Sequence, residues 1–336
     1  MNTRSNVAVL GAGAFGTALA RLLCDNGHSV RLWTRNLAHV RQMRSTGENG
    51  LYLPGFGLPA SLRLCTDLDE SVRDCDWLLI AVPSRGFAPL LEQLVRLPIG
   101  ALPPLACASK GLEPQRARLL HEVAAEQLGC EVGYAVLSGP SFAAEIAGGQ
   151  PTAVTVASED VVFARRVATA LHCQVFRAYT STDVTGVEVG GAVKNVMAIA
   201  AGICDGLGFG ANTRAALVTR ALAEMTRLGL ALGASAATFL GLAGVGDLML
   251  TCGDDKSRNR RFGLALGRGA TVEHALTEVG ALVEGLPNTH EVVRIASRVG
   301  VEMPIAEQVY KVLYQGVSPQ TAVDSLLLRE LRSESG

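Results

Sequence analysis

The first half of the chain alternates short apolar runs with stretches of helical periodicity. Apolar runs typical of strands lie at residues 6–10, 29–33, 77–82, 105–108, 134–137 and 152–157. The helical stretch at residues 15–25 ends at Asn26 and Gly27, which are residue types that terminate helices. Strands that alternate with helices form right-handed βαβ units, so this half predicts a mostly parallel, Rossmann-like sheet in an α/β fold.

The pattern changes near Thr180 and is almost wholly helical afterwards. Asp183 is placed to cap a long helix that runs to about Cys204. Further helical patterns lie at residues 212–228, 272–279, 289–299 and 305–314. We therefore predict a dinucleotide-binding Rossmann-like domain at residues 1–182 and a helical substrate-binding and catalytic domain at residues 183–332. The cleft between two such domains is a natural ligand site.

Composition narrows the classes of partner. The chain has 336 residues, of which 49% are hydrophobic and 18% are charged, with a net charge of -1. This charge argues against a nucleic-acid partner. The eight cysteines include no Cys-x-x-Cys pair and none has a histidine at zinc-ligand spacing, so we expect reduced thiols and no metal site. Charged or amide residues interrupt the apolar stretches before ~18 residues. Together with the absence of a secretory signal pattern, this predicts no membrane insertion and a cytoplasmic protein.

A glycine-rich loop follows the first predicted strand. Gly11, Gly13 and Gly16 form a G-x-G-x-x-G pattern that opens a helix, which is the context of a dinucleotide-binding loop. The first glycine permits a tight turn, the second lets the backbone approach a pyrophosphate, and the third allows close helix–strand packing. The helix N-terminus also carries partial positive charge toward the phosphates.

Arg35 stands after the second predicted strand, where an acidic residue would bind the ribose 2′-hydroxyl of NAD. A guanidinium at this position can instead pair with the 2′-phosphate of NADP. We therefore predict NADPH/NADP as the preferred cofactor, with NADH/NAD as the alternative. A solvated surface arginine is the other interpretation of Arg35.

Two lysines are candidates for chemistry. Lys110 follows a strand end, where it can reach a cofactor or an anionic substrate, although a solvated surface lysine fits the same position. Lys194 lies in an apolar helix after Gly190 and Gly191. Desolvation there would lower its pKa and suit it to proton exchange near neutrality. The alternative is a lysine that extends from the rim of the helix to solvent.

Polar residues elsewhere fit a phosphorylated substrate. Asp247 lies in a glycine-rich apolar loop, where it would pair with Lys194 or a substrate hydroxyl, or else cap a helix. Ser257, Arg258 and Asn259 combine donors that suit a phosphate ester. A nucleic-acid contact is disfavoured because this basic run is short. In the loop after another strand, the backbone amides near Gly139 and the hydroxyl of Ser141 can also hydrogen-bond a substrate.

Seven motifs occur in a characteristic order, at residues 11–16, 108–113, 138–143, 189–195, 241–248, 257–263 and 283–285. With them the chain resembles the bacterial-type NAD(P)-dependent glycerol-3-phosphate dehydrogenases from Val7 to about Val323. The resemblance implies reversible reduction of dihydroxyacetone phosphate to sn-glycerol 3-phosphate, which supplies glycerophospholipid synthesis. It also implies a homodimer.

The resemblance further implies roles for individual residues. Lys194 would be the proton donor in reduction and the acceptor in oxidation, while Lys110 would touch both substrate and cofactor, and Asp247 would complete the catalytic group. The implied substrate contacts are Lys110, Gly139, Ser141, Lys194, Asp247, Ser257, Arg258 and Asn259. The implied cofactor contacts are Gly11, Gly13, Ala14, Phe15, Gly16, Arg35, Lys110, Ala143, Arg258, Leu282 and Glu284.

Asn195 is added to the candidate site on chemical grounds, because its amide adjoins Lys194. The chain departs from the family pattern at two places. Ala14 and Phe15 stand where a Ser-Tyr or Ser-Trp pair is frequent, which removes a hydroxyl near the phosphates but leaves the backbone loop. Leu282 replaces a frequent valine.

Two other functions compete with this interpretation. A two-domain reductase of β-hydroxyacids or ketopantoate-like substrates would also pair a Rossmann domain with a helical domain and a lysine, but would not require the donors at residues 257–259. A non-catalytic dinucleotide sensor would keep the glycine loop without needing Lys194 in an apolar helix.

Overall fold

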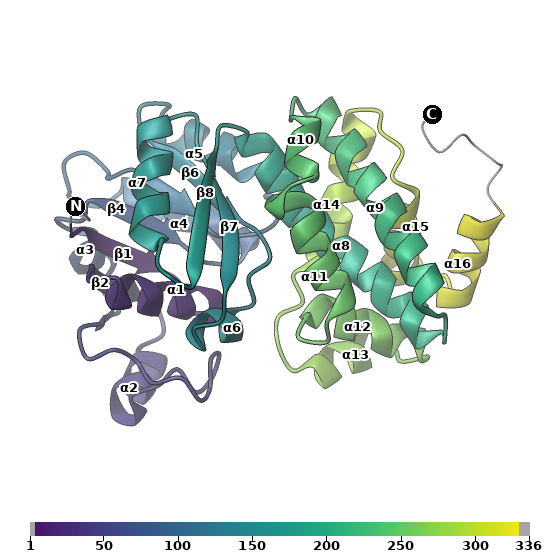
Figure 1. The fold of residues 1–336 in the computed structure, drawn as a ribbon, viewed down its shortest axis with the longest axis horizontal. Coiled ribbons are helices and arrows are strands. Elements are labelled where there is room, and N and C mark those ends of the chain that lie inside the picture. The colour runs from purple at the N-terminus through teal and green to yellow at the C-terminus, as the bar shows by residue number, and fades with distance from the viewer. Residues whose placement is uncertain (1–3, 329–336) are drawn as a thin grey trace.

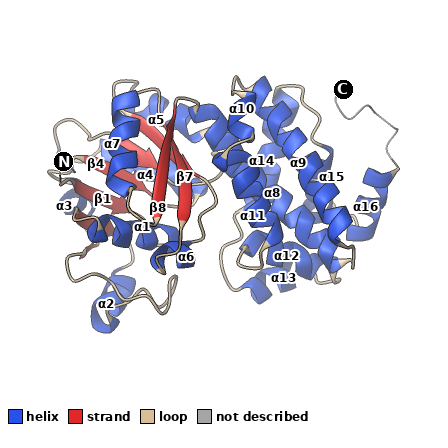
Figure 2. Cartoon of the chain, in the orientation of Figure 1, coloured by secondary structure: helices blue, strands red, loops and turns tan. Residues whose placement is uncertain are grey.

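The computed structural model describes residues 4–328 and places a sheet-containing region beside a helical one (Figure 1). All strands lie on one side of the molecule (Figure 2). They are β1 (Asn6–Leu10), β2 (Ser29–Trp33), β3 (Arg63–Cys65), β4 (Trp77–Ile80), β5 (Leu105–Cys107), β6 (Tyr134–Ser138), β7 (Thr152–Ala157) and β8 (Phe176–Ser181). They form one sheet in the order β3-β2-β1-β4-β5-β6-β7-β8. All neighbouring pairs are parallel except β6 and β7, so the sheet is mostly parallel, as predicted.

The predicted strands agree with the structure, whereas two strands were not predicted. β1, β2 and β7 have the predicted bounds, and β4 ends two residues earlier than expected. β3 was missed because it has only three residues, too few for an apolar pattern. β8 was missed because it is an edge strand whose residues are partly exposed and polar.

The helices of the first half cover both faces of the sheet. They are α1 (Ala14–Asp25), α2 (Leu37–Thr46), α3 (Leu68–Val72), η1 (Ser84–Gly86), α4 (Phe87–Val95), α5 (Leu120–Leu128), α6 (Ala143–Ala147) and α7 (Val161–Leu171). Along β1, Val7 and Val9 join one apolar core while Ala8 and Leu10 join another. Burial on both faces explains why the strands are apolar runs rather than alternating patterns.

The second half is helical and is built around one central helix. Its elements are α8 (Val184–Gly206), α9 (Ala211–Ala231), α10 (Ala236–Phe239), η2 (Leu242–Gly246), α11 (Asp247–Gly253), α12 (Arg258–Gly267), α13 (Val272–Val279), α14 (Gly285–Arg298), α15 (Pro304–Tyr314) and α16 (Pro319–Leu327). α8 is buried along nearly its whole length, and α9, α11, α12 and α14 pack around it. A helix that is apolar on all sides belongs in such a position. The predicted domain end at residue 332 lies outside the described residues.

Two segments of the described chain have the length and apolar composition of membrane-spanning helices. These are Val184–Gly206 and Ala236–Gly253, each with a mean hydropathy of 1.4. The first is wholly buried inside the fold, which is the pattern of a core helix. The second is interrupted at Gly244, whose φ of −101° and ψ of −105° are not helical. Length and composition are therefore weak indications of membrane insertion here.

Candidate active site

The glycine loop has the geometry that its sequence predicted. Gly11 adopts a φ of +125°, and a Cβ there would lie 2.6 Å from the carbonyl oxygen of Ala81, so only glycine fits this turn. A Cβ on Gly16 would overlap the carbonyl oxygen of Gly11, which shows how closely α1 packs on the loop. By contrast, a Cβ on Gly13 would meet no heavy atom within 4 Å. The loop is therefore open at Gly13, where a pyrophosphate would approach.

Arg35 lies just beyond β2 and is exposed. Among residues 4–328 it has no hydrogen-bond or ion-pair partner, whereas its neighbour Asn36 caps α2 by accepting a hydrogen bond from the His39 N–H at 3.1 Å. A free guanidinium at this edge of the sheet is available to an anionic ligand.

Three charged side chains from distant parts of the chain meet at a buried point. Asp247 begins α11 and is 1% exposed. One of its carboxylate oxygens pairs with Lys194 Nζ of α8, and the other lies 3.0 Å from Lys110 Nζ. Lys110 also donates to the Gly139 carbonyl oxygen at 3.4 Å, and its Nζ lies 5.4 Å from the centre of the Phe15 ring. The fold thus connects the glycine loop with both catalytic candidates of the helical half.

Burial and charge tune the ionisable groups of this cluster. Burial lowers the pKa of Lys194 to about 8. The carboxylate of Asp247 opposes this shift, but burial is the larger effect, and the positive charge of Lys110 acts in the same direction as burial. Burial disfavours the charged form of Asp247, but the two ammonium groups outweigh it and lower its pKa. An ammonium next to a carboxylate, with a pKa near neutrality, can give up and recover a proton at physiological pH.

The glycines of α8 allow the close contacts that form this cluster. A Cβ on Gly190 would overlap the carbonyl oxygen of Ala243, just before Asp247. A Cβ on Gly191 would lie 3.3 Å from Ser138 Oγ and 3.6 Å from Lys110 Cγ. α8 therefore approaches the Asp247 segment so closely that a larger residue does not fit at Gly190, and it packs tightly on Ser138 and Lys110 at Gly191.

The donors predicted to bind phosphate lie at the start of α12. Ser257 is buried and caps the helix by accepting a hydrogen bond from the Arg260 N–H at 3.2 Å. Arg258 is exposed and has no ion-pair or hydrogen-bond partner among the described residues. The helix N-terminus and an unpaired guanidinium together make a site for an anion.

Asn259 is buried and links three elements. Its Nδ2 donates to Asn195 Oδ1 at 2.9 Å, and its Oδ1 accepts from the Gly285 N–H at 2.8 Å. One amide hydrogen remains for a substrate. The amide thereby ties α8, next to Lys194, to the start of α14, next to Glu284.

Other predicted site residues lie around the same region. Ser141 donates to the Gly139 carbonyl oxygen at 2.8 Å, and Ala143 begins α6 two residues later. Glu284 precedes α14. Burial raises the pKa of its carboxyl group and outweighs the opposing effect of the positive charges of Arg258, Lys110 and Lys194. The half-buried Leu282 lies two residues earlier in the chain and has no polar contact to its side chain.

Sequence reasoning missed several contacts at this site. Ser138 Oγ donates to the Asp247 carboxylate at 3.4 Å. Ser138 begins the motif of residues 138–143, but this contact was not predicted. Lys256, next to Ser257, pairs with Glu145 of α6 at 2.6 Å and lies 5.9 Å from the centre of the Phe142 ring. These contacts join residues 109 or more positions apart, and spacing along the chain carries no signal for them.

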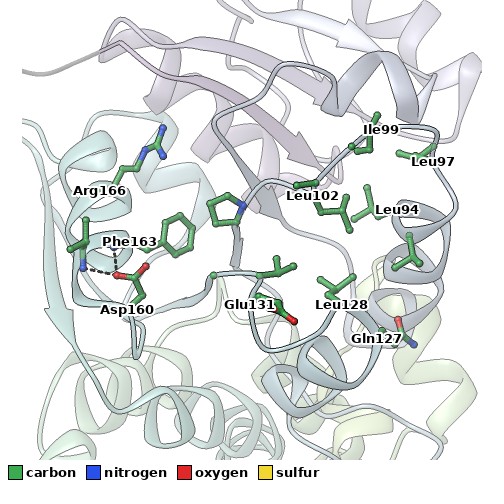
Figure 3. Close-up of a pocket in the computed structure, with 17 residues that line it drawn as sticks. Leu94, Leu97, Ile99, Leu102, Gln127, Leu128, Glu131, Asp160, Phe163 and Arg166 are labelled. Carbon is green, nitrogen blue, oxygen red and sulfur yellow. Dashed lines mark hydrogen bonds between the residues drawn. The ribbon is translucent and has the colours of Figure 1, made fainter.

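A separate surface pocket, shown in Figure 3, shares no lining residue with this cluster. Its volume is about 650 Å³, and its apolar lining includes Leu97, Leu102, Leu128 and Phe163. The lining segments lie before β5, before β6 and at the start of α7, at the ends of the strands opposite the glycine loop. No predicted site residue lines it, so we do not connect this pocket with the chemistry. Within residues 4–328 there is also no group of three or more His, Cys, Asp or Glu side chains that could hold a metal ion.

The chain is similar to known proteins along nearly its whole length. The family models for the N-terminus and the C-terminus of NAD-dependent glycerol-3-phosphate dehydrogenase match residues 6–164 and 183–324. Glycerol-3-phosphate dehydrogenase [NAD(P)+] from Colwellia psychrerythraea is 52% identical over 99% of this chain and 100% of its own length. The enzyme of the same name from Pseudoalteromonas translucida is 53% identical over 98% of each chain.

A solved structure extends the likeness to three dimensions. The crystal structure of glycerol-3-phosphate dehydrogenase from Coxiella burnetii superposes with a TM-score of 0.94 at 46% identity, covering 97% of this chain and 99% of that one. Sequence and fold therefore agree over nearly the full length. The chain belongs to the NAD(P)-dependent glycerol-3-phosphate dehydrogenase family.

Proposed function

We propose that the protein catalyses the reversible, NAD(P)H-dependent reduction of dihydroxyacetone phosphate to sn-glycerol 3-phosphate, which supplies glycerophospholipid synthesis. The observation that carries the proposal is the buried cluster of Lys194, Asp247 and Lys110. Lys110 of this cluster lies beside Phe15 of the glycine loop, and Lys194 adjoins Asn195, which is hydrogen-bonded to Asn259 of α12. A dehydrogenase of a phosphorylated ketone needs these three parts together: a dinucleotide site, a proton donor and a phosphate site.

Lys194 acts on the carbonyl oxygen of the substrate. The bound nicotinamide supplies the hydride, and the protein supplies orientation and charge. As negative charge develops on the oxygen, the Lys194 ammonium stabilises it and then donates its proton; the neutral amine accepts the proton in the reverse direction. Asp247 holds the ammonium in place, and Lys110 adds a second positive charge beside the reacting group.

The substrate phosphate binds to Ser257, Arg258 and Asn259. Arg258 has no partner within the described chain, so its guanidinium can engage the phosphate without breaking an existing contact. Gly139 and Ser141 complete the substrate contacts. Holding the phosphate away from the reacting carbon fixes the geometry of the carbonyl at Lys194.

NADPH is the preferred cofactor in this proposal, with NADH as the alternative. The unpaired Arg35 supports a contact with the 2′-phosphate. The remaining cofactor contacts are Gly11, Gly13, Ala14, Phe15, Gly16, Lys110, Ala143, Arg258, Leu282 and Glu284. The open space at Gly13 and the fit of the turn at Gly11 support this placement.

Further expectations belong to the same proposal. We place the domain boundary between residues 182 and 183, in the connection from β8 to α8. We expect a cytoplasmic homodimer, and light scattering of the purified protein tests the dimer.

NADPH oxidation with dihydroxyacetone phosphate tests the proposed reaction directly. We expect steady turnover with this ketone and a loss of at least about 100-fold in kcat/KM with unphosphorylated dihydroxyacetone, since charge-assisted contacts to the phosphate are lost. Equal rates with the two ketones, or turnover only with a β-keto acid, would contradict the proposal.

A further inference from the structure

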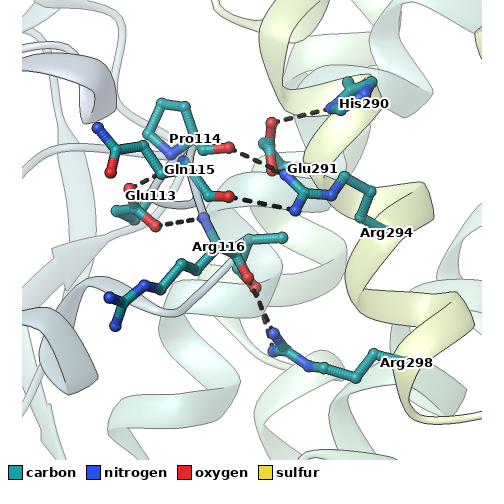
Figure 4. Close-up of polar contacts among 9 residues, drawn as sticks. Glu113, Pro114, Gln115, Arg116, His290, Glu291, Arg294 and Arg298 are labelled. Carbon is teal, nitrogen blue, oxygen red and sulfur yellow. Dashed lines mark hydrogen bonds and ion pairs between the residues drawn. The ribbon is translucent and has the colours of Figure 1, made fainter.

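The loop after Lys110 is held by a helix of the other domain (Figure 4). Residues 113–118 close on themselves through the Glu113 N–H, which donates to the Arg118 carbonyl oxygen at 2.9 Å. The Glu113 carboxylate is buried and accepts from the N–H groups of Gln115 and Arg116, both at 2.8 Å. This closure directs four successive backbone carbonyls, those of residues 114–117, toward α14.

Two arginines of α14 bind these four carbonyls. Arg294 donates to the carbonyl oxygens of Pro114 at 3.1 Å and Gln115 at 3.2 Å. Arg298 donates to those of residue 116 at 2.9 Å and residue 117 at 3.1 Å. The two arginines are four residues apart and so lie on the same face of the helix. Hydrogen bonds from a charged donor are roughly twice as strong as neutral ones.

The same helix also contacts the backbone of Lys110 itself. Asn288, which is 1% exposed, donates from Nδ2 to the Lys110 carbonyl oxygen at 3.3 Å. Gly111 adopts a φ of +153°, and a Cβ there would lie 2.5 Å from Asn288 Oδ1 and 2.8 Å from Ser84 Oγ. α14 therefore contacts the loop both at Lys110 and four to seven residues beyond it.

The sheet secures Lys110 only from one side. The last sheet hydrogen bond before it runs from the Ala108 N–H to the Ile80 carbonyl oxygen at 2.8 Å, and Ser109 Oγ donates to Val82 at 2.5 Å. Beyond Lys110, α14 binds the backbone of the loop, while Glu126 of α5 pairs with the side chains of Arg116 and Arg118. The Arg294 side chain is itself held by the buried Glu291, whose carboxylate accepts from it at 3.2 Å.

We propose that Arg294 and Arg298 are positioning residues that hold Lys110 at Asp247 and Lys194, by clamping the loop of residues 114–117 against α14. This inference rests on the proposed function, in which Lys110 contacts substrate and cofactor. Neither arginine contacts the reacting atoms. Their effect passes through the loop backbone to Lys110, whose Nζ must lie beside Asp247 for the cluster to form.

The test compares Arg294→Gln, Arg298→Gln and the double variant with a matched control. Arg227→Gln removes a similar bond, from Arg227 to the Glu302 carbonyl oxygen at 3.2 Å, elsewhere in the helical domain. We expect the double variant to lose about tenfold in the single-turnover rate of NADPH oxidation, within the 100-fold that a misplacement of about 1 Å can cost. The control should keep the wild-type rate. If the double variant does not fold, the single variants, each lacking two of the four bonds, give the same comparison.

The pH dependence of the single-turnover rate distinguishes a displaced Lys110 from a general loss of stability. The charged groups around Lys194 are Asp247, Lys110 and Glu284, and the Cys252 thiol also lies nearby. The positive charge of Lys110 lowers the pKa of Lys194. If Lys110 moves away from Lys194 in the double variant, the pKa of Lys194 should rise, and the pH above which the rate falls should rise with it. An unmoved profile with a lowered rate would overturn the inference.

A double-mutant cycle with Lys110→Ala distinguishes this inference from the proposed function. If the arginines act through Lys110, adding both Gln substitutions to Lys110→Ala should change the rate by less than about twofold, because the effects of coupled residues do not add. A further loss of about tenfold would overturn the inference and leave the proposed function intact. A wild-type rate for Lys110→Ala alone would refute the role of Lys110, and with it both proposals for this residue.

Discussion

The glycine loop and the lysine–aspartate cluster are built in contrasting ways. The loop that would hold the dinucleotide consists of neighbouring residues, and its shape depends on the backbone turn at Gly11 and on the close packing of α1 at Gly16. The cluster brings together Lys110, Lys194 and Asp247 from three separate elements. A local loop tolerates changes elsewhere in the fold, whereas a cluster assembled from distant elements depends on every contact that positions them. The two regions should therefore respond differently to substitution.

Lys194→Ala should give the largest loss of activity and leave dinucleotide binding at the glycine loop unchanged. We expect a loss of about 1000-fold in kcat, within the range for removal of a general acid, while NADPH binding measured by fluorescence titration stays near the wild-type value. Lys194→Arg serves as the control that keeps the charge, and it should be similarly inactive because a guanidinium does not release its proton. A near-normal rate for either variant would remove Lys194 from the mechanism.

Arg258→Gln should weaken substrate binding at the helical side. Loss of charge-assisted hydrogen bonds to the phosphate costs about 1.5–3 kcal/mol, or roughly 10- to 100-fold in kcat/KM. Arg261→Gln, at an exposed position one turn along the same helix, is the matched control and should change little. Equal losses for the two variants would argue against a specific phosphate contact at Arg258.

Arg35→Asp should change the choice of cofactor without changing the reaction at the lysine–aspartate cluster. We expect the preference for NADPH over NADH to fall by about tenfold or more, since an arginine–phosphate contact is replaced by repulsion. The kcat with saturating NADH should stay within about twofold. Arg41→Asp, also exposed and close by on α2, controls for the change in surface charge. An unchanged preference ratio would show that Arg35 does not contact the 2′-phosphate.

The smallest effect concerns an ion pair that joins α5 to α8. His121 of α5 pairs with the buried Glu188 of α8 at 2.9 Å. Burial opposes the charged imidazole, but the hydrogen bond and charge of Glu188 outweigh it and raise the pKa of His121. A raised pKa means that the stabilisation is complete below the unfolded value of about 6.5 and is lost as pH rises through the folded value.

The measurement for this contact is the free energy of unfolding of His121→Gln against wild type. We expect the variant to be less stable by about 1 kcal/mol at pH 5.5, with a smaller difference at pH 9. His172→Gln, at an exposed position, should show no such trend. A difference that grows with pH would reverse the assigned sign.

The contrast between the regions also explains what the sequence could predict. The strands of residues 6–10 and 29–33 and the loop between them were predictable because each signal is local. The pairing of Asp247 with Lys194 was predicted only as one of three alternatives, since spacing along the chain does not determine which distant elements meet. The Arg294 and Arg298 contacts carried no signal at all, because their acceptors are backbone carbonyls that any residue provides.

The most direct test of the central claim is the pH dependence of the single-turnover rate of reduction, measured for wild type and Asp247→Asn. If Lys194 donates the proton, the wild-type rate should fall above pH of about 8, where the ammonium is lost. Since Asp247 raises the pKa of Lys194, its removal should move this fall to lower pH. A wild-type rate that stays constant to pH of about 10, the ordinary range of a lysine, or a fall that does not move in Asp247→Asn, would contradict the account.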